Sequence, residues 1–498
     1  MNVNPITRLD YPDPDVIRVE DTYYMVSTTM HFMPGCEILQ SFDLVHWEHV
    51  TYVYETLDHT DAQQLKSGQN IYGQGMWAAS LRYHEGRFYI CFVANDTRKT
   101  YLYTSEKIDG PWKKQLIEGF YHDGSLLFDE DGRNYIVYGN DEIWITELNE
   151  DLTAPKKDGL HRLLVSDHKN PELGYEGSHI QKINGYYYIF LVHSLRDRWM
   201  RTEACFYSDS LEGEFTGGDV LCDDRGYCGQ GVAQGGIVDT PDGKWYAMLF
   251  QDSGAVGRIP ILLPVTWKDH FPVFGQNGHV PEEIEVHSTR PGYIYQPLVG
   301  SDDFCNGLLP RWQFNHDPDP RYYHLDTLQG TYTITTREVC TELTQAVNTL
   351  TQRMSYPSCA AEVTVDASAL KEGDVAGLCA LQGCYAAVGI TKHHGKYEVL
   401  MLDKKEDGIL DMTEGTVVES HQMDFRLEAD FCNMKDEARC YYRVNKGDWL
   451  PIGTVHKLYF KLDHFTGCRF GLFCYAAEET GGSACFRDFK YYDVDEIL

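Results

Sequence analysis

Three carboxylic acids in the first half of the chain stand in the same phase of a repeated pattern. Each precedes the last aromatic residue of a turn-and-strand motif by 11 or 12 positions: Asp13 before Tyr24, Asp123 before Tyr135 and Glu176 before Tyr188. The two other copies of the motif, which end at Tyr89 and Tyr246, hold Trp77 and Gln234 at the equivalent position. Two opposed carboxyl groups can hydrolyse a glycosidic bond, because one protonates the leaving oxygen while the other activates water. A third carboxylate can raise the pKa of the acid by like-charge repulsion.

Each of these acids, taken singly, also has a purely structural interpretation. Asp13 lies between two prolines and could be a turn residue, whereas Asp123 and Glu176 each precede a glycine and could cap a hairpin or stand on a rim. Their shared phase favours chemistry, because unrelated turn residues would not keep one distance from a repeated motif.

The repeated motif predicts the fold that positions these residues. It consists of a turn residue, one or two polar residues, an aromatic pair and an apolar run, and it occurs at residues 20–24, 85–89, 131–135, 184–188 and 242–246. Its Asp-Gly and Asn-Gly pairs indicate tight hairpins, because glycine adopts positive φ without steric cost. A strand-and-hairpin unit of this length is typical of propeller blades. We therefore predict a five-bladed β-propeller over residues 1–295, with the three acids, Trp77 and Gln234 at one mouth of its channel.

A second domain is indicated where the motif ends, near Trp267. Prolines at 281, 291 and 297 mark a connector, and beyond it polar and apolar residues alternate without the motif, as at 331–335 and 397–401. Short strands separated by turn signals over about 200 residues are typical of a β-sandwich. The expected fold class is all-β, with the propeller followed by a β-sandwich over residues 300–498.

The charge balance narrows the choice of partners. The chain has 498 residues, 43 Lys and Arg, 75 Asp and Glu, and a formal net charge of −32. An acidic surface repels nucleic acid and anionic membranes, so neither is expected as a partner.

The chain starts without a signal-peptide pattern, has no apolar run long enough for a transmembrane helix, and has 15 cysteines with no C-x-x-C pair. We therefore expect a cytoplasmic protein with reduced thiols and no zinc site.

Five ordered motifs resemble glycoside hydrolase family 43, and the resemblance covers nearly the whole chain. They lie at residues 11–15 (YPDPD), 77–83 (WAASLRY), 122–126 (HDGSL), 175–179 (YEGSH) and 251–258 (QDSGAVGR). The tail, including residues 301–304 and 312–316, is similar to the concanavalin-like sandwich that follows the propeller in the β-xylosidase branches.

The resemblance implies a role for each site residue. Asp13 matches the general base, Glu176 the general acid, and Asp123 the carboxylate that orients the acid and modulates its pKa. Further residues match the substrate-binding positions of the family: Trp77 and Phe32 as aromatic walls of the sugar subsite, and Arg258 as a donor to substrate hydroxyls. Gln234, placed by the phase of the fifth repeat, is expected to bind substrate beside them.

The implied activity is inverting hydrolysis of pentosides. We expect an exo-acting β-xylosidase that releases xylose from the non-reducing end of small xylo-oligosaccharides. Two alternatives stay open: an α-L-arabinofuranosidase, since the same three acids serve both sugars, and a non-catalytic glycan-binding propeller, which would not need an opposed acid and base. The oligomeric state is open, a homo-oligomer included.

The chain departs from the family pattern on the fifth blade. Many members carry a histidine there, beside a central metal or water cluster, whereas residues 232–236 (VAQGG) contain none. We therefore expect no required cofactor and no metal ligands, with a mostly water-ligated calcium in the channel as the alternative. Ser253 stands where a basic residue or histidine is common, so the leaving-group side is expected to differ.

Overall fold

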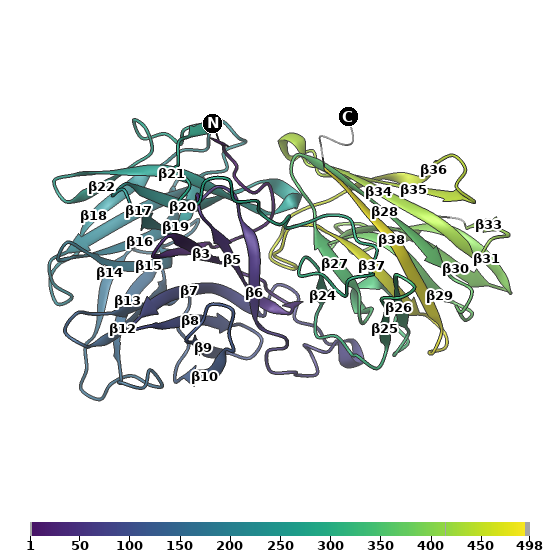
Figure 1. The fold of residues 1–498 in the computed structure, drawn as a ribbon, viewed down its shortest axis with the longest axis horizontal. Coiled ribbons are helices and arrows are strands. Elements are labelled where there is room, and N and C mark those ends of the chain that lie inside the picture. Colours follow the sequence, from purple (N-terminus) through teal and green to yellow (C-terminus); the bar gives the residue numbers. More distant parts are fainter. Residues whose placement is uncertain (1, 414, 494–498) are drawn as a thin grey trace.

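The molecule consists of two β domains that lie side by side (Figure 1). The computed structural model describes residues 2–413 and 415–493, in which the only helices are four short 3-10 turns: η1 (Lys66–Gly68), η2 (Gly254–Val256), η3 (Leu343–Gln345) and η4 (Cys432–Met434). Five four-stranded antiparallel sheets form the N-terminal domain, and two larger sheets form the C-terminal domain. The predicted all-β fold class, with a five-bladed propeller followed by a sandwich, is confirmed.

Each blade is built from one continuous segment of chain, and its first strand lines the channel. Blade 1 comprises β2 (Asp15–Val19), β3 (Thr22–Val26), β5 (Gly35–Ser41) and β6 (Glu48–Tyr54); blade 2 comprises β7 (Met76–His84), β8 (Arg87–Ala94), β9 (Lys99–Ser105) and β10 (Lys113–Ile117). Blade 3 comprises β11 (Ser125–Phe128), β12 (Asn134–Asn140), β13 (Glu142–Leu148) and β14 (His161–Ser166). Blade 4 comprises β15 (Glu176–Ile183), β16 (Tyr186–Ser194), β17 (Arg201–Ser208) and β18 (Thr216–Leu221); blade 5 comprises β19 (Val232–Asp239), β20 (Trp245–Asp252), β21 (Arg258–Lys268) and β22 (Phe271–Phe274).

The repeated sequence motif corresponds to the first hairpin of each blade. Its last aromatic residue is the second or third residue of the second strand, and four of the turns hold a glycine with φ between 79° and 84°: Gly86, Gly132, Gly185 and Gly243. A left-handed backbone is what these tight turns require. In the first blade the turn residue with positive φ is Glu20, at 55°, one position before the place that glycine takes in the other four.

The ring is closed by contact between the first and last blades. β2 packs against β19, and Arg18 on β2 forms an ion pair with Asp239 on β19. The chain start adds a second closure, because β1 (Asn2–Val3) pairs with β23 (Glu283–Ile284), which follows blade 5.

Arg82 on β7 fills the middle of the channel and joins four blades. It donates hydrogen bonds to Asp15 Oδ2 of blade 1 at 2.8 Å, to Ser125 Oγ of blade 3 at 2.7 Å and to the Ile180 carbonyl of blade 4 at 3.2 Å. The other oxygen of Asp15 lies 3.1 Å from Nδ1 of His179. A largely covered guanidinium with all these partners fixes the inner strands relative to one another.

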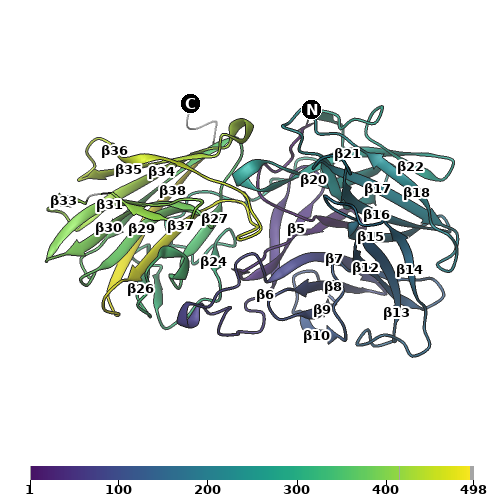
Figure 2. The ribbon, with the colours of Figure 1, turned by 180° about the vertical axis from the view of Figure 1, so that it is seen from behind.

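The C-terminal domain is a sandwich of two antiparallel sheets around an apolar core (Figure 2). One sheet contains β24 (Gln313–Asn315), β27 (Leu350–Arg353), β29 (Asp374–Leu381), β30 (Tyr385–His393), β31 (Lys396–Lys404), β32 (Leu410–Met412), β33 (Thr416–Val418) and β37 (Arg469–Ala476). The other contains β25 (Tyr323–Asp326), β26 (Thr331–Thr335), β28 (Ser358–Asp366), β34 (Gln422–Asp430), β35 (Glu437–Val444), β36 (Leu450–Lys457) and β38 (Ser483–Asp493). The first sheet gains an edge strand from the propeller, because β4 (Phe32–Met33) pairs with β24.

Buried charged groups join the two domains. Arg353 of the sandwich forms an ion pair with Glu37 of blade 1 at 2.8 Å, and both side chains are buried. Asp10 accepts hydrogen bonds from the backbone N–H of Arg258 at 2.7 Å and from that of Gly467, on the sandwich, at 2.8 Å. Removing one partner of such a buried pair costs about 3–5 kcal/mol, so the domains are held in one arrangement. In the part of the chain that the structure describes, no helix is long and apolar enough to cross a membrane.

Candidate active site

A cavity of about 550 Å³ opens at one mouth of the propeller channel. This volume is within the usual range for small-molecule sites, about 300–1,000 Å³. Six of the seven site residues expected from the sequence line it: Asp13, Trp77, Asp123, Glu176, Gln234 and Arg258. Part of the wall comes from the sandwich, in particular from the connection between β36 and β37, which supplies Phe460, Lys461, Leu462 and Phe465.

The inner strands present these residues through irregular backbone at the channel mouth. Asp13, Asp123 and Gln234 have positive φ of 52°, 47° and 64°. The register of the first hairpin shifts next to Trp77 in blade 2, next to Glu176 in blade 4 and next to Gln234 in blade 5. Bulges and left-handed residues re-aim side chains that a regular strand would direct into a blade. The same departure from regular pairing thus recurs around the ring at the residues that could do chemistry.

Asp13 is held by two donors. Its Oδ1 accepts a hydrogen bond from Nη1 of Arg258 at 2.9 Å, and its Oδ2 accepts one from the Thr28 hydroxyl at 2.6 Å. All three side chains are buried around this carboxylate, and the guanidinium compensates its negative charge. An ionised, fixed carboxylate at the edge of a cavity suits a general base, because each oxygen keeps a lone pair for water.

Glu176 has one oxygen anchored and one free. Oε2 accepts a hydrogen bond from Nδ2 of Asn140 at 2.8 Å and lies 3.4 Å from Nε2 of His122. Oε1 makes no hydrogen bond to any described residue. A carboxyl group arranged in this way can carry a transferable proton on the oxygen that has no protein partner.

Asp123 and His122 surround the same carboxyl group. Asp123 accepts a hydrogen bond from the Gly177 N–H at 2.9 Å, and burial together with the charges of Glu176 and Asp13 raises its pKa to about 6. Burial disfavours a charged His122, but the Asp123 and Glu176 carboxylates outweigh that effect and raise the pKa of His122 to about 9. His122 is therefore an imidazolium at neutral pH, between two carboxyl groups.

Aromatic rings from both domains flank the acids. The Phe465 ring of the sandwich lies 5.6 Å from Trp77 and 4.4 Å from the guanidinium carbon of Arg258. Such faces suit the apolar side of a sugar ring and also fix the arginine by a cation–π contact.

Phe32 does not line the cavity, which corrects the expectation that it walls the sugar subsite. It is fully buried on β4, where its ring packs 3.4 Å beneath the guanidinium of Arg469. Because β4 pairs with β24, Phe32 belongs to the interface between the domains. The aromatic wall is supplied by Phe465, about 430 positions later in the chain, a contact that no local sequence pattern indicates.

Several residues of the cavity were missed by the sequence analysis. Arg201 and Asp252 line it as an ion pair, with Nε of the buried Arg201 2.8 Å from Oδ2 of Asp252. His122 and Asn140 were missed as well, although His122 adjoins a recognised acid and could have been noticed as the one titratable neighbour of Asp123 in its motif.

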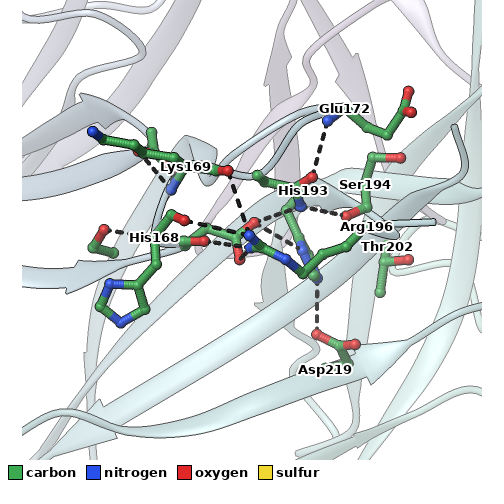
Figure 3. A network of polar contacts seen from close by, with 12 residues as sticks. His168, Lys169, Glu172, His193, Ser194, Arg196, Thr202 and Asp219 are labelled. Atoms are coloured by element: carbon green, nitrogen blue, oxygen red, sulfur yellow. Dashed lines mark hydrogen bonds and ion pairs between the residues drawn. The ribbon is translucent and has the colours of Figure 1, made fainter. Parts of the chain in front are cut away.

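Two loops form the rim of the cavity: the connection from blade 3 to blade 4, which carries Glu172 and Leu173, and the β16–β17 loop of blade 4, which carries the half-exposed Trp199. A polar network ties these loops to the blade (Figure 3). In it, Nε2 of His193 lies 2.8 Å from Asp219, and Arg196 donates to the Asp167, His168 and Lys169 carbonyls at 2.6 to 3.4 Å. A rim fixed in this way can present Trp199 as a platform for the part of a substrate that leaves the cavity.

The described residues do not favour a metal ion here. Within the described ranges, one group of three side chains could hold a metal ion: His122, Asp123 and Glu176. Their potential ligand atoms, one from each side chain, lie within 4.8 Å of one another. A metal ion here would have to displace the proton of His122, whose pKa the Asp123 and Glu176 carboxylates raise to about 9, and replace the imidazolium as their counter-ion. In the channel, both oxygens of the Asp15 carboxylate already have partners, Arg82 and His179. Calcium prefers carboxylate ligands, and this one is not free to bind it.

Comparisons with known proteins match both domains of the chain. The family model for glycosyl hydrolases family 43 matches residues 3–272, and that for the beta xylosidase C-terminal concanavalin A-like domain matches residues 301–492. A beta-xylosidase of Formosa agariphila is 27% identical over 99% of this chain and 89% of its own length. A xylosidase/arabinosidase of Butyrivibrio fibrisolvens is 24% identical over 99% of both chains.

A solved structure is also similar over nearly the whole chain. It is a bifunctional GH43-CE protein of Bacteroides eggerthii, 42% identical, with a TM-score of 0.92 and coverage of 99% of this chain. This chain spans 64% of the length of that bifunctional protein.

Proposed function

The chain belongs to glycosyl hydrolase family 43, and we propose that it is an inverting β-xylosidase that releases xylose from the non-reducing end of xylo-oligosaccharides. The observation that carries the proposal is the construction of the cavity. Two carboxyl groups with different partners, the buried Asp13 and the partly exposed Glu176, share one cavity, and a loop of the second domain covers part of its mouth. A partly covered mouth fits the end of an oligosaccharide better than the middle of a polymer.

The partners of each acid suggest the course of the reaction. Asp13 takes a proton from a water molecule whose oxygen attacks the anomeric carbon. Glu176 gives the proton on Oε1 to the glycosidic oxygen, which receives the electron pair of the breaking C–O bond. Asp123, fixed by the Gly177 N–H, orients Glu176 and repels its negative charge, which favours the protonated acid before the reaction.

A second activity is favoured by the relatives. The Butyrivibrio protein is named a xylosidase/arabinosidase, and a protein of Bacteroides ovatus that matches 66% of this chain is named a non-reducing end alpha-L-arabinofuranosidase. Xylopyranose and arabinofuranose offer related hydroxyl patterns to the same acids, so α-L-arabinofuranosidase is the second candidate. A non-catalytic glycan-binding role would leave the paired acids of the cavity and the left-handed backbone at Asp13 and Asp123 without a purpose.

The deciding experiment is a substrate panel. The purified protein is assayed on nitrophenyl β-D-xyloside, α-L-arabinofuranoside and α-L-arabinopyranoside, and on xylobiose. We expect the highest kcat/KM on the β-D-xyloside and release of xylose from xylobiose. A higher kcat/KM on the α-L-arabinofuranoside would assign the second activity instead. Binding of xylobiose without turnover of any of the four substrates would contradict both.

A further inference from the structure

We propose that His122 is a positioning residue that acts through Glu176. As an imidazolium cation it stabilises the carboxylate that Glu176 becomes when the leaving group is protonated, and it holds Oε2 so that the transferable proton is on Oε1. This inference rests on the proposed glycosidase function, and it concerns how strongly the enzyme can protonate a poor leaving group.

The geometry places His122 between the two carboxyl groups. Nε2 lies 3.4 Å from Oε2 of Glu176 and 3.6 Å from Oδ2 of Asp123. The imidazole also meets the Trp77 ring nearly edge-on at 5.8 Å, and the His122 carbonyl accepts a hydrogen bond from the Gly139 N–H at 3.0 Å. Backbone and ring are therefore both fixed, and the ring is only slightly exposed.

The charges around the cavity leave His122 as the counter-ion of this acid. Arg258 is paired with Asp13, and Arg201 is paired with Asp252. Among the described residues, the cationic side chain within 4.0 Å of Glu176 or Asp123 is His122 alone. The titratable groups that face it are Asp123 beside it in the loop before β11, Glu176 on β15 and Asp13 ahead of β2, with Arg201 of β17 acting on Glu176 and Asp13 at longer range.

The ion pair strengthens as the reaction proceeds. Before proton transfer, a neutral Glu176 carboxyl faces the imidazolium. When the Oε1 proton moves to the glycosidic oxygen, the C–O bond breaks, its electron pair passes to that oxygen, and the water that attacks the anomeric carbon gives its proton to Asp13. His122 keeps its own proton throughout and now faces a full negative charge. An interaction that is stronger in the transition state than in the ground state raises kcat.

The test compares leaving groups in variants that differ in charge. His122→Gln keeps an N–H donor but removes the positive charge. His122→Phe keeps an aromatic ring against Trp77 but removes both the N–H donor and the positive charge. We expect both variants to lose about 10–100-fold in kcat/KM on xylobiose but less than about threefold on an activated dinitrophenyl β-xyloside, which needs little protonation. His84 stacks on Phe128 at the far end of the channel, so His84→Gln is the matched control. It should change kcat/KM on neither substrate.

The pH profile provides a readout that a structural role would not change. Removing the cation favours the protonated forms of Glu176 and Asp123, so both limbs of the kcat/KM profile should move to higher pH by about 1 unit. The proposal would be overturned if His122→Gln lost kcat/KM equally on both substrates and kept the wild-type pH profile. It would also be overturned if the ratio of kcat/KM between the two substrates stayed at its wild-type value. Wild-type enzyme that hydrolyses no pentoside would instead refute the proposed function, so the two failures are distinguishable.

Discussion

Arg258 donates a hydrogen bond from Nη1 to Oδ1 of Asp13 at 2.9 Å, and both side chains are buried at the channel mouth. The remaining donors of this guanidinium, at Nε and Nη2, are buried without a partner among the described residues. Buried donors that lack a partner are costly unless a ligand completes them. Arg258 therefore connects the base to the position where substrate hydroxyls would bind.

Replacing Arg258 should separate charge compensation from substrate binding. In Arg258→Lys the cation beside Asp13 is kept but the spare donors are lost, so we expect a raised KM and about a 10–100-fold fall in kcat/KM. In Arg258→Met the Asp13 charge is left unpaired, which should also lower the free energy of unfolding by about 3–5 kcal/mol. Steady-state kinetics and urea unfolding measure the two effects. Equal stability of the two variants would contradict the pairing.

Replacing Glu176 by glutamine should remove the acid and leave the fold intact. Gln keeps an oxygen and an amide within reach of Asn140 but cannot donate a proton in the reaction, so turnover of xylobiose should fall by about 10²–10⁴-fold. Hydrolysis of an activated nitrophenyl xyloside should fall less, and Asp13→Asn should lose both activities alike. Wild-type turnover of xylobiose by Glu176→Gln would show that the acid lies elsewhere.

Much of this arrangement could be predicted from the sequence, and what could not has a physical reason. The turns of the repeats, three of which are Asp-Gly or Asn-Gly, determine the first hairpin of each blade, so a count back from Tyr135 or Tyr188 finds the channel mouth. Phe465 and Phe32 could not be placed in this way, because their positions depend on how two domains dock. Asn140 stands at the end of a second strand, outside the phase of the repeat, and only the folded blade brings it 2.8 Å from Glu176.

The titration of Asp123 should change the free energy of unfolding and the activity in opposite directions as pH rises. Its pKa of about 6 lies above the ordinary value of 3.8, so the folded state binds this proton more tightly than the unfolded chain. The stability that this group contributes is present at low pH and is lost as pH rises through about 6. Asp123→Asn should therefore unfold at higher denaturant concentration than wild type above pH 6, by on the order of 2 kcal/mol, with a smaller difference near pH 4.

The same substitution should cripple catalysis, because the amide cannot repel the Glu176 charge. In the wild type, kcat/KM should fall as pH drops below about 6, where Asp123 gains a proton. Parallel urea titrations and pH–rate profiles of both proteins check this. A less stable Asp123→Asn protein at pH 8 would contradict the assignment.

We expect the enzyme to work without a divalent metal ion. Arg82 places a guanidinium in the middle of the channel and takes Asp15 as its partner, so a calcium ion there would meet a cation. Treatment with EDTA followed by gel filtration should leave kcat/KM and the thermal midpoint unchanged, and added Ca²⁺ should restore nothing. A loss of activity that Ca²⁺ reverses would show that a water-ligated ion binds beside these residues.

The placement of Asp13 and Glu176 predicts the stereochemistry of the reaction. They come from blades 1 and 4, which are not neighbours in the ring, and they line one cavity between them. Inverting enzymes keep their two carboxyl groups about 6.5–9.5 Å apart to admit a water molecule, whereas retaining enzymes keep them about 5–5.5 Å apart for direct attack. Asp13 is also held by Arg258 and Thr28 on both oxygens, which suits a fixed base better than a nucleophile that must approach the sugar. We therefore expect a single displacement, and proton NMR of early β-xyloside hydrolysis should show α-xylose as the first-formed anomer. If β-xylose formed first, or if a sugar were trapped covalently on Asp13, this residue would be a nucleophile and the assignment of the base would be wrong.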